Sequence, residues 1–241
     1  MRKGSVKNAI LITSVVLLAI AVVVLSILLS VKKKADDRAT LNEYYSMKTY
    51  SFGIQNANLS KGQIVFIGDS ITDLYPLDDY YADLDKAVYN RGISGDTTQG
   101  VLDRLKISLY DVAPQIVVLM IGVNDINGGK TNEYIADNYG KILSDIKTNL
   151  PSSEVFCVSV LPMNTTVGLS AEDVKARNEQ ISSLNERIAA LAVDRGYAFV
   201  DLNAAVRNGD GTLIVNYSDD GLHLNANGFA VWTATIKPLL R

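Results

Sequence analysis

The sequence predicts an α/β domain with a five-stranded parallel sheet, preceded by one N-terminal transmembrane helix. Apolar runs of strand length alternate with segments whose apolar residues recur at helical spacing, which is typical of a parallel sheet covered by helices. Residues 9–31 carry no charge and are dominated by Ile, Leu, Val and Ala. The 241-residue chain keeps about 210 residues after this segment, enough for one sizeable hydrophobic core.

The apolar segment 9–31 is long enough to cross a bilayer as a helix, since about 20 residues span the hydrocarbon core. A cleaved signal peptide is the alternative, but its apolar region is only roughly 7 to 15 residues long, and no small-x-small cleavage pattern follows here. We therefore expect an uncleaved signal anchor. Residues 1–8 form a short basic N-terminus, residues 32–39 a charged linker and residues 40–241 the folded domain. Basic residues flank the segment on both sides, so the positive-inside rule does not orient it. We expect a single-pass protein of the cell membrane with its domain outside.

Composition limits the partners and cofactors. Residues 1–31 hold three of the 23 basic residues and none of the 26 acidic ones, so the remaining chain is acidic. Nucleic acid is therefore not an expected partner, because its binding is driven by Lys and Arg. A single Cys and a single His exclude an intrachain disulfide and the usual zinc sites, while an oxygen-only calcium site stays open. We expect no cofactor and no metal, and we expect Cys157 to be buried.

Five apolar runs predict the strands of the sheet. They are short and nearly continuous, which is typical of parallel strands buried on both faces. Their spacing suits one doubly wound sheet. The runs are residues 63–67, 87–90, 116–121, 154–160 and 198–201.

Capping residues and apolar spacing predict the longer helices. Residues 131–150 place apolar side chains along one face, and Pro151 ends that helix. Ser170 is predicted to cap the next helix, which ends before Gly196. A last helix is predicted to begin near Asn225. The buried faces are predicted to be Ile135, Tyr139, Ile142, Ile146 and Leu150, then Val174, Ile181, Leu184, Ile188 and Leu191, and finally Phe229, Trp232 and Ile236.

The segment after the charged linker is rich in aromatic residues, namely Tyr44, Tyr45, Tyr50 and Phe52. We expect them to pack against the domain, because large apolar side chains usually serve burial. The alternative is that they grip a sugar or a lipid tail.

The only histidine, His223, follows Asp220 by three residues. An imidazole oriented by a carboxylate is the general base that a serine hydrolase needs. The best candidate for the nucleophile is Ser70, where an apolar run stops at a Gly-Asp-Ser turn.

Polar residues also follow the second and third predicted strands, at Gly95 and Asn124. The carboxyl ends of parallel strands form the crevice of an open α/β sheet, so these residues should gather near Ser70 and His223. Taken singly, Gly95 could only supply a positive φ and Asn124 could only cap a turn. Their joint placement favours one functional site.

These segments resemble the four blocks of the SGNH, or GDSL, hydrolase family in order: residues 68–71, 93–97, 122–125 and 220–223. The resemblance covers residue 63 to the C-terminus, and the first block differs mildly by having Ile71 in place of Leu. It implies a flavodoxin-like three-layer α/β/α sandwich. It also implies roles for the site residues. Ser70 would be the nucleophile, His223 the general base and acid, and Asp220 the orienting carboxylate, with Asp219 as the competing neighbour. The backbone N–H groups of Ser70 and Gly95 and the Asn124 amide would form the oxyanion hole.

The resemblance implies an esterase acting on a carbohydrate or lipid ester, with a short acyl chain or an acetyl group. Residues 92–98 and Arg104 look most like the platelet-activating-factor acetylhydrolase-like branch and related bacterial esterases. An O-acyltransferase using the same triad and an inactive binding module are the two alternatives. The sequence leaves the natural substrate and the oligomeric state open.

Overall fold

The computed structural model describes residues 2–240, and the side chains of residues 17–240. The contacts within the chain divide it into one unit that ends at Tyr44 and a second that begins at Tyr45. Helix α1 (Arg2–Asn56) contains the charged segment 32–39, so this predicted linker is helical. The predicted domain boundary at residue 40 therefore lies within a helix.

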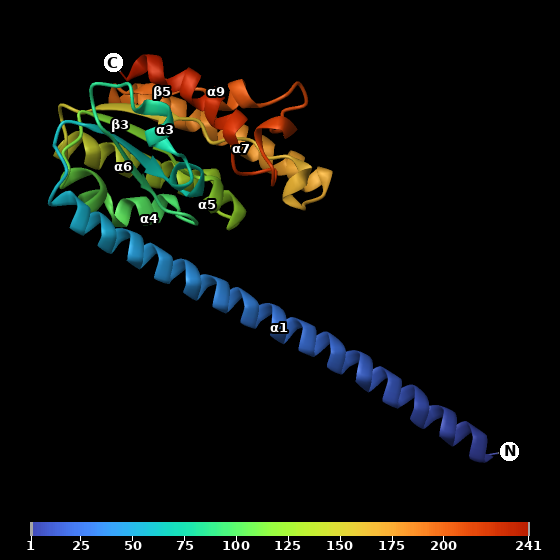
Figure 1. The fold of residues 1–241 in the computed structure, drawn as a ribbon. Helices are drawn as coiled ribbons and strands as arrows, with labels where there is room; N and C mark the ends of the chain where they lie inside the picture. Colours follow the sequence, from blue (N-terminus) through green and yellow to red (C-terminus); the bar gives the residue numbers. More distant parts are fainter. Residues whose placement is uncertain (1, 241) are drawn as a thin grey trace. The chain divides into compact units, whose positions relative to one another are not determined.

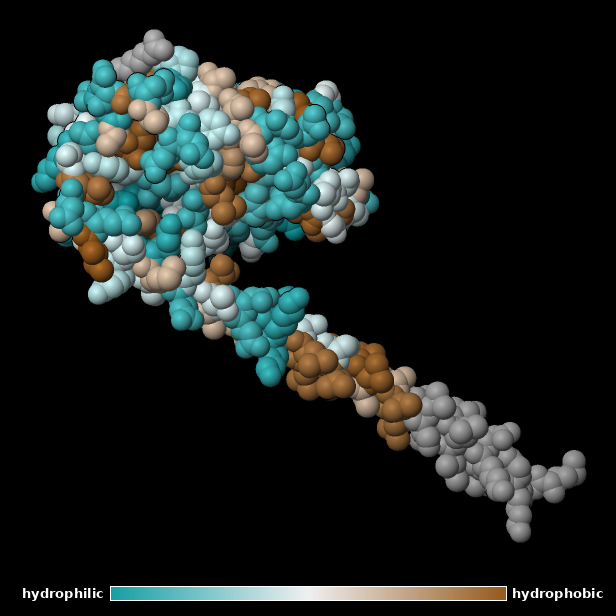
Figure 2. Space-filling model, in the orientation of Figure 1, coloured by the Kyte–Doolittle hydropathy of each residue, from teal (hydrophilic) through white to brown (hydrophobic). Residues whose placement is uncertain are grey.

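In the first unit, large apolar side chains are exposed from Leu17 to Val31. Figure 2 shows this apolar stretch on α1 in brown. Within the part of the chain whose side chains are described, no helix has the apolar length needed to cross a membrane. The predicted transmembrane segment, residues 9–31, begins outside that part, because the side chains of residues 9–16 are not among those described.

The second unit contains a sheet of five parallel strands in the order β2 (Val88–Gly92), β1 (Ile64–Gly68), β3 (Ile116–Met120), β4 (Glu154–Val158) and β5 (Ala198–Val200). All five predicted strands are present, with bounds within two residues of the predicted ones. This order is one of the two common arrangements of doubly wound sheets, whose ligand crevice lies where the strand order reverses. That point lies between β1 and β3, at the end of β1.

Helices cover both faces of the sheet, with α4 (Thr98–Asp103) and α6 (Asn132–Asn149) on one side and α3 (Leu77–Tyr81) and α9 (Ala226–Ile236) on the other (Figure 1). The cap predicted at Ser170 is confirmed, and Thr131 and Asn225, where only helix starts were predicted, are caps as well. The side chain of Thr131 accepts a hydrogen bond at the start of α6, and that of Ser170 does so at the start of α7 (Ala171–Arg195). Gly196 ends α7 in the left-handed conformation, and Asn225 caps α9. The predicted helix faces are buried, apart from the partly buried Leu191.

The end of α1 from Tyr45 onward belongs to the second unit. Phe52 is buried, and the Tyr45 hydroxyl donates a hydrogen bond to the Gly100 carbonyl, 3.1 Å away. The packing predicted for these two residues is therefore confirmed. It is wrong for Tyr50, which is 72% exposed. Tyr50 lies two residues before Phe52 on a helix, and at about 100° per residue this places it on the opposite face.

Candidate active site

Ser70 lies where β1 passes into the short helix α2 (Ser70–Asp73). The Asp69 carboxylate caps this helix by accepting a hydrogen bond from the Ile71 amide at 3.0 Å. Gly68 allows the close approach of the neighbouring strand, because a Cβ atom there would lie 2.2 Å from the Met120 carbonyl oxygen. The strand end therefore presents Ser70 at the carboxyl edge of the sheet, where the residue is 8% exposed.

The loop between residues 218 and 224 holds His223 in one orientation. Gly221 has a φ of 83°, which an L side chain rarely adopts, and this lets the loop reverse between Asp220 and His223. Oδ1 of Asp220 accepts hydrogen bonds from the amides of Leu222 and His223, and its Oδ2 lies 2.6 Å from Nδ1 of His223. Asp219 instead accepts a hydrogen bond from Asn225. Of the two adjacent carboxylates, the histidine contacts Asp220.

Nε2 of His223 lies 2.9 Å from Oγ of Ser70, although the two residues are 153 positions apart in the sequence. Aromatic packing holds the two segments together. The ring of Tyr75, just beyond Ser70, stacks on Phe229 of α9 with centroids 4.6 Å apart. Oη of Tyr75 also lies 2.6 Å from Oγ1 of Thr233. The segment after the serine and the helix after the histidine are thus parts of one packed cluster.

The charge of Asp220 determines which histidine nitrogen carries a proton. Its partial burial would raise the pKa, but hydrogen bonds from His223 and from two backbone amides outweigh this and lower the pKa of Asp220 to about 2. The carboxylate is therefore ionised near neutral pH and accepts a hydrogen bond from Nδ1 of His223. In the neutral ring this leaves Nε2 as the acceptor for the Ser70 hydroxyl.

Gly95 lies in a turn and Asn124 in a short helix, and a hydrogen bond joins these two segments. Gly95 has a φ of 80° in the turn after β2, and Asn124 lies in α5 (Val123–Asn127), after β3. Nδ2 of Asn124 donates a hydrogen bond to the Asp96 carbonyl at 2.9 Å. The structure thus links the two predicted oxyanion residues through the residue that follows Gly95.

A buried ion pair supports the same loops, and the sequence did not assign it. Nε of Arg104 lies 2.7 Å from Oδ2 of Asp96, and both side chains are at most 2% exposed. Arg104 also donates to the carbonyls of Gly68 at 3.0 Å and Arg91 at 2.8 Å. One guanidinium therefore joins the ends of β1 and β2 to the loop around Asp96. Arg104 is part of the family resemblance noted in the sequence, but no feature of the sequence pairs it with Asp96.

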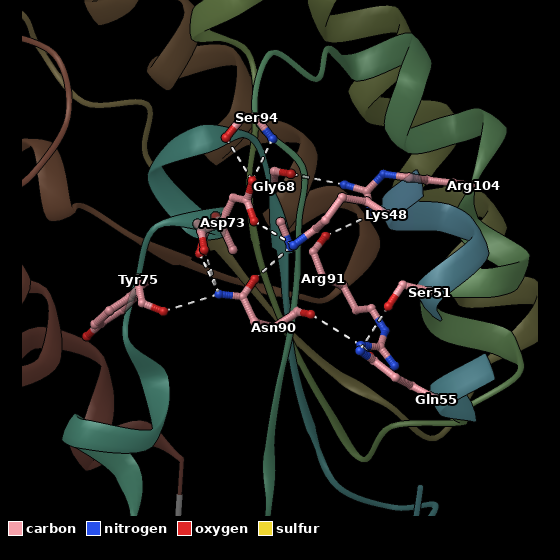
Figure 3. Close-up of polar contacts among 12 residues, drawn as sticks. Lys48, Ser51, Gln55, Gly68, Asp73, Tyr75, Asn90, Arg91, Ser94 and Arg104 are labelled. Atoms are coloured by element: carbon pink, nitrogen blue, oxygen red, sulfur yellow. Dashed lines mark hydrogen bonds and ion pairs between the residues drawn. The ribbon is translucent and has the colours of Figure 1, made fainter. Parts of the chain in front are cut away.

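Asp73, three residues after Ser70 on the same short helix, was also missed. Its Oδ2 accepts hydrogen bonds from the Ser94 amide at 3.0 Å and from the Ser94 hydroxyl at 2.7 Å. Its Oδ1 lies 2.7 Å from Nζ of Lys48 on α1. Figure 3 shows Asp73 between Ser94 and Lys48. This carboxylate ties the helix of Ser70 to the residue before Gly95.

A cavity of about 540 Å³ lies beside the edge strand β2 and the end of α1. Lys48, Phe52 and Arg91 are among its lining residues, whereas Ser70 and His223 are not. The cavity is therefore separate from the serine and histidine pair. Among the described residues, no group of three or more His, Cys, Asp or Glu side chains is arranged to hold a metal ion.

Comparisons with known proteins identify the family of this chain. The model of the GDSL-like Lipase/Acylhydrolase family matches residues 66–231. Platelet-activating factor acetylhydrolase IB subunit alpha1 of Bos taurus is 30% identical over 181 residues, covering 74% of this chain and 75% of that protein.

Two solved structures share the fold at somewhat lower identity. One, described as a platelet activating factor from Streptococcus pneumonia, has a TM-score of 0.76 and 28% identity, covering 85% of this chain and 96% of that chain. A GDSL-like lipase from Bacteroides thetaiotaomicron has a TM-score of 0.69 and 26% identity, covering 80% of this chain and 96% of that chain. The chain belongs to the GDSL-like lipase/acylhydrolase family, the SGNH/GDSL hydrolases, and is a carboxylic ester hydrolase.

Proposed function

We propose that this hydrolase is a serine esterase in which Ser70 is the nucleophile, His223 the general base and acid, and Asp220 the residue that orients the imidazole. The observation that carries the proposal is the 2.9 Å contact between Oγ of Ser70 and Nε2 of His223. His223 takes the serine proton during attack on the ester carbonyl and returns it to the leaving alcohol. Water then attacks the acyl-enzyme by the same route and releases the acid.

The proposed oxyanion hole consists of the backbone N–H groups of Ser70 and Gly95 and the side-chain amide of Asn124. Negative charge develops on the carbonyl oxygen only as Ser70 attacks. Donors that are already in place therefore stabilise the transition state more than the bound ester. The hydrogen bond from Asn124 to the Asp96 carbonyl, which joins the short helix of Asn124 to the turn of Gly95, supports this assignment.

The proposed substrate is a short-chain ester, in particular an acetyl ester of a carbohydrate or lipid. The 30% identity to a protein named as an acetylhydrolase supports the acetyl group. A panel of p-nitrophenyl esters of increasing acyl length tests it. We expect kcat/KM to be highest for the acetate, and a maximum at octanoate or longer would overturn the acetyl assignment.

We propose that residues 9–31 anchor the enzyme in the cell membrane by a single pass, with the hydrolase domain outside. The uncharged apolar run in the sequence supports this. After fractionation we expect the full chain in the membrane pellet, resistant to carbonate extraction. Protease added to intact cells should remove the domain. Recovery in the soluble fraction would refute the anchor, and protection from the protease would refute the orientation.

The triad is tested with Ser70→Ala. We expect this variant to lose p-nitrophenyl acetate hydrolysis and labelling by a fluorophosphonate probe, while the exposed-site control Ser152→Ala keeps both. Turnover at the wild-type rate in Ser70→Ala would reject the nucleophile. Labelling without release of free acetate, unless a sugar acceptor is added, would instead indicate an acyltransferase.

A further inference from the structure

We infer that Lys48, on the last turns of α1, is a positioning residue that sets the geometry of the loop carrying Gly95, acting through Asp73. The inference rests on the proposed function, since it assigns a support to the proposed oxyanion hole. It adds a residue that lies outside the part of the chain matched by the family model, residues 66–231.

Asp73 connects the two backbone donors of the proposed oxyanion hole. It is the last residue of α2, whose first residue is Ser70. Through Oδ2 it holds both the amide and the hydroxyl of Ser94, the residue before Gly95. A shift of this carboxylate therefore changes the distance between the Ser70 amide and the Gly95 amide.

Lys48 determines where the Asp73 carboxylate lies. Its Nζ is 2.7 Å from Oδ1 of Asp73, and the side chains are 22% and 5% exposed, respectively. An ionised carboxylate that is this buried needs a cation or several donors to offset its lost hydration. Without the Lys48 ammonium, we expect the carboxylate to turn toward water and to loosen its two bonds to Ser94.

The end of α1, which carries Lys48, is itself fixed to the sheet, so the position of Lys48 is well defined. Arg91 of β2 donates from Nη1 to Oε1 of Gln55 at 3.0 Å and from Nη2 to Oδ1 of Asn56 at 2.8 Å. Its guanidinium carbon lies 4.5 Å from the centre of the Phe52 ring. These contacts hold the end of α1 against the edge strand (Figure 3 shows the Gln55 side chain next to the Arg91 guanidinium).

The test is Lys48→Ala in the full chain, with p-nitrophenyl acetate as substrate. We expect kcat to fall about 10- to 100-fold, since misplacing a catalytic donor by about 1 Å has effects of this order. KM should change by no more than about twofold, because the loop acts on the transition state rather than on the bound ester. Lys61→Ala, which removes an exposed lysine, is the matched control and should behave as the wild type.

Rescue separates positioning from a general loss of structure. Lys48 lines the cavity of about 540 Å³, so a small alkylammonium ion can reach the space left by its side chain. We expect ethylammonium chloride to restore part of the kcat of Lys48→Ala, and sodium chloride at equal ionic strength to restore none. Lys48→Arg, which keeps the charge, should retain more kcat than Lys48→Ala.

A second variant covers the case in which Lys48→Ala does not fold. Ser94→Ala removes only the hydroxyl bond to Asp73, and we expect about a tenfold lower kcat with an unchanged melting temperature. A folded Lys48→Ala with wild-type kcat overturns the inference, as does a Ser94→Ala with wild-type kcat. These results are distinct from failure of the proposed function, in which Ser70→Ala would itself remain active.

Discussion

The side-chain amide of Asn124 donates a hydrogen bond to the backbone carbonyl of Asp96, and this bond joins the turn that follows β2 to the short helix α5 that follows β3. Nδ2 carries two hydrogens, so one can hold the loop while the other remains for an oxyanion. The same bond keeps Asp96 and its neighbour Gly95 beside the amide. Asn124 therefore has both a structural and a proposed catalytic part.

We predict that Asn124→Ala lowers kcat about 100- to 1,000-fold, the usual effect of removing one oxyanion donor. KM for p-nitrophenyl acetate should change little, because the donor acts mainly on the charge that develops during attack. Asn127→Ala, in the same short helix, is the control. Its side chain contacts Arg177 at the surface, and it should keep wild-type kinetics. If Asn124→Ala lowers kcat by less than about tenfold, Asn124 is not a donor of the oxyanion hole.

Asp220→Asn should lower kcat about 10,000-fold, as expected when the orienting carboxylate of a triad becomes an amide. The amide would donate to the ring through its nitrogen and favour the wrong tautomer of His223. Steady-state kinetics with p-nitrophenyl acetate measure the loss. Asp219→Asn, at the adjacent carboxylate, should retain activity. The reverse ranking would assign the orienting role to Asp219.

Arg104→Met should lower the free energy of unfolding by about 3–5 kcal/mol, because it leaves the buried Asp96 without its cation. Lys106→Met is the matched control. Its partner Asp111 lies in an exposed pair, for which about 1 kcal/mol or less is usual. Urea unfolding followed by circular dichroism measures both. Equal losses in the two variants would contradict a special role for the buried pair.

The stability of the fold should depend on pH through Asp69. Burial, and then the neighbouring charges of Asp96 and Asp125, raise the pKa of Asp69 to about 7. Above the usual carboxyl range the folded state therefore holds a proton that the unfolded chain has lost. The free energy of unfolding must then fall as the pH rises from about 4 to about 7.

This dependence is measured by urea unfolding across that pH range. Asp69→Asn cannot ionise, so its free energy of unfolding should fall less steeply with pH than that of the wild type. Asp137→Asn, at an exposed position on α6, should follow the wild type. Parallel curves for Asp69→Asn and the wild type would show that Asp69 does not titrate in this range.

The sheet and its longer helices could be predicted because their signals are local. The central strands β1 and β3 are apolar runs that are buried along their whole length. The helices α6, α7 and α9 each have a cap that lies next to them in the sequence. Thr131, Ser170 and Asn225 act as caps in the structure. The contact between Asp220 and His223 could also be predicted, because the two residues are only three positions apart and lie in one loop.

The supporting contacts could not be predicted, because they depend on distant residues. Nothing in the sequence pairs Lys48 with Asp73, because the strand β1 separates them along the chain. Nothing in it predicts the hydrogen bond from Arg104 to the Gly68 carbonyl either. Tyr50 is exposed because it lies on the opposite face of α1 from the buried Phe52. These features depend on how the elements pack against one another. No single segment of the sequence contains that information.

The separation of 153 positions between Ser70 and His223 has a consequence for biosynthesis. The serine leaves the ribosome when most of the domain is still untranslated, and the imidazole follows only with the last helix. A nascent chain therefore carries the proposed nucleophile long before its proposed base has been made. A chain that ends before residue 220 lacks two of the three residues of the proposed triad.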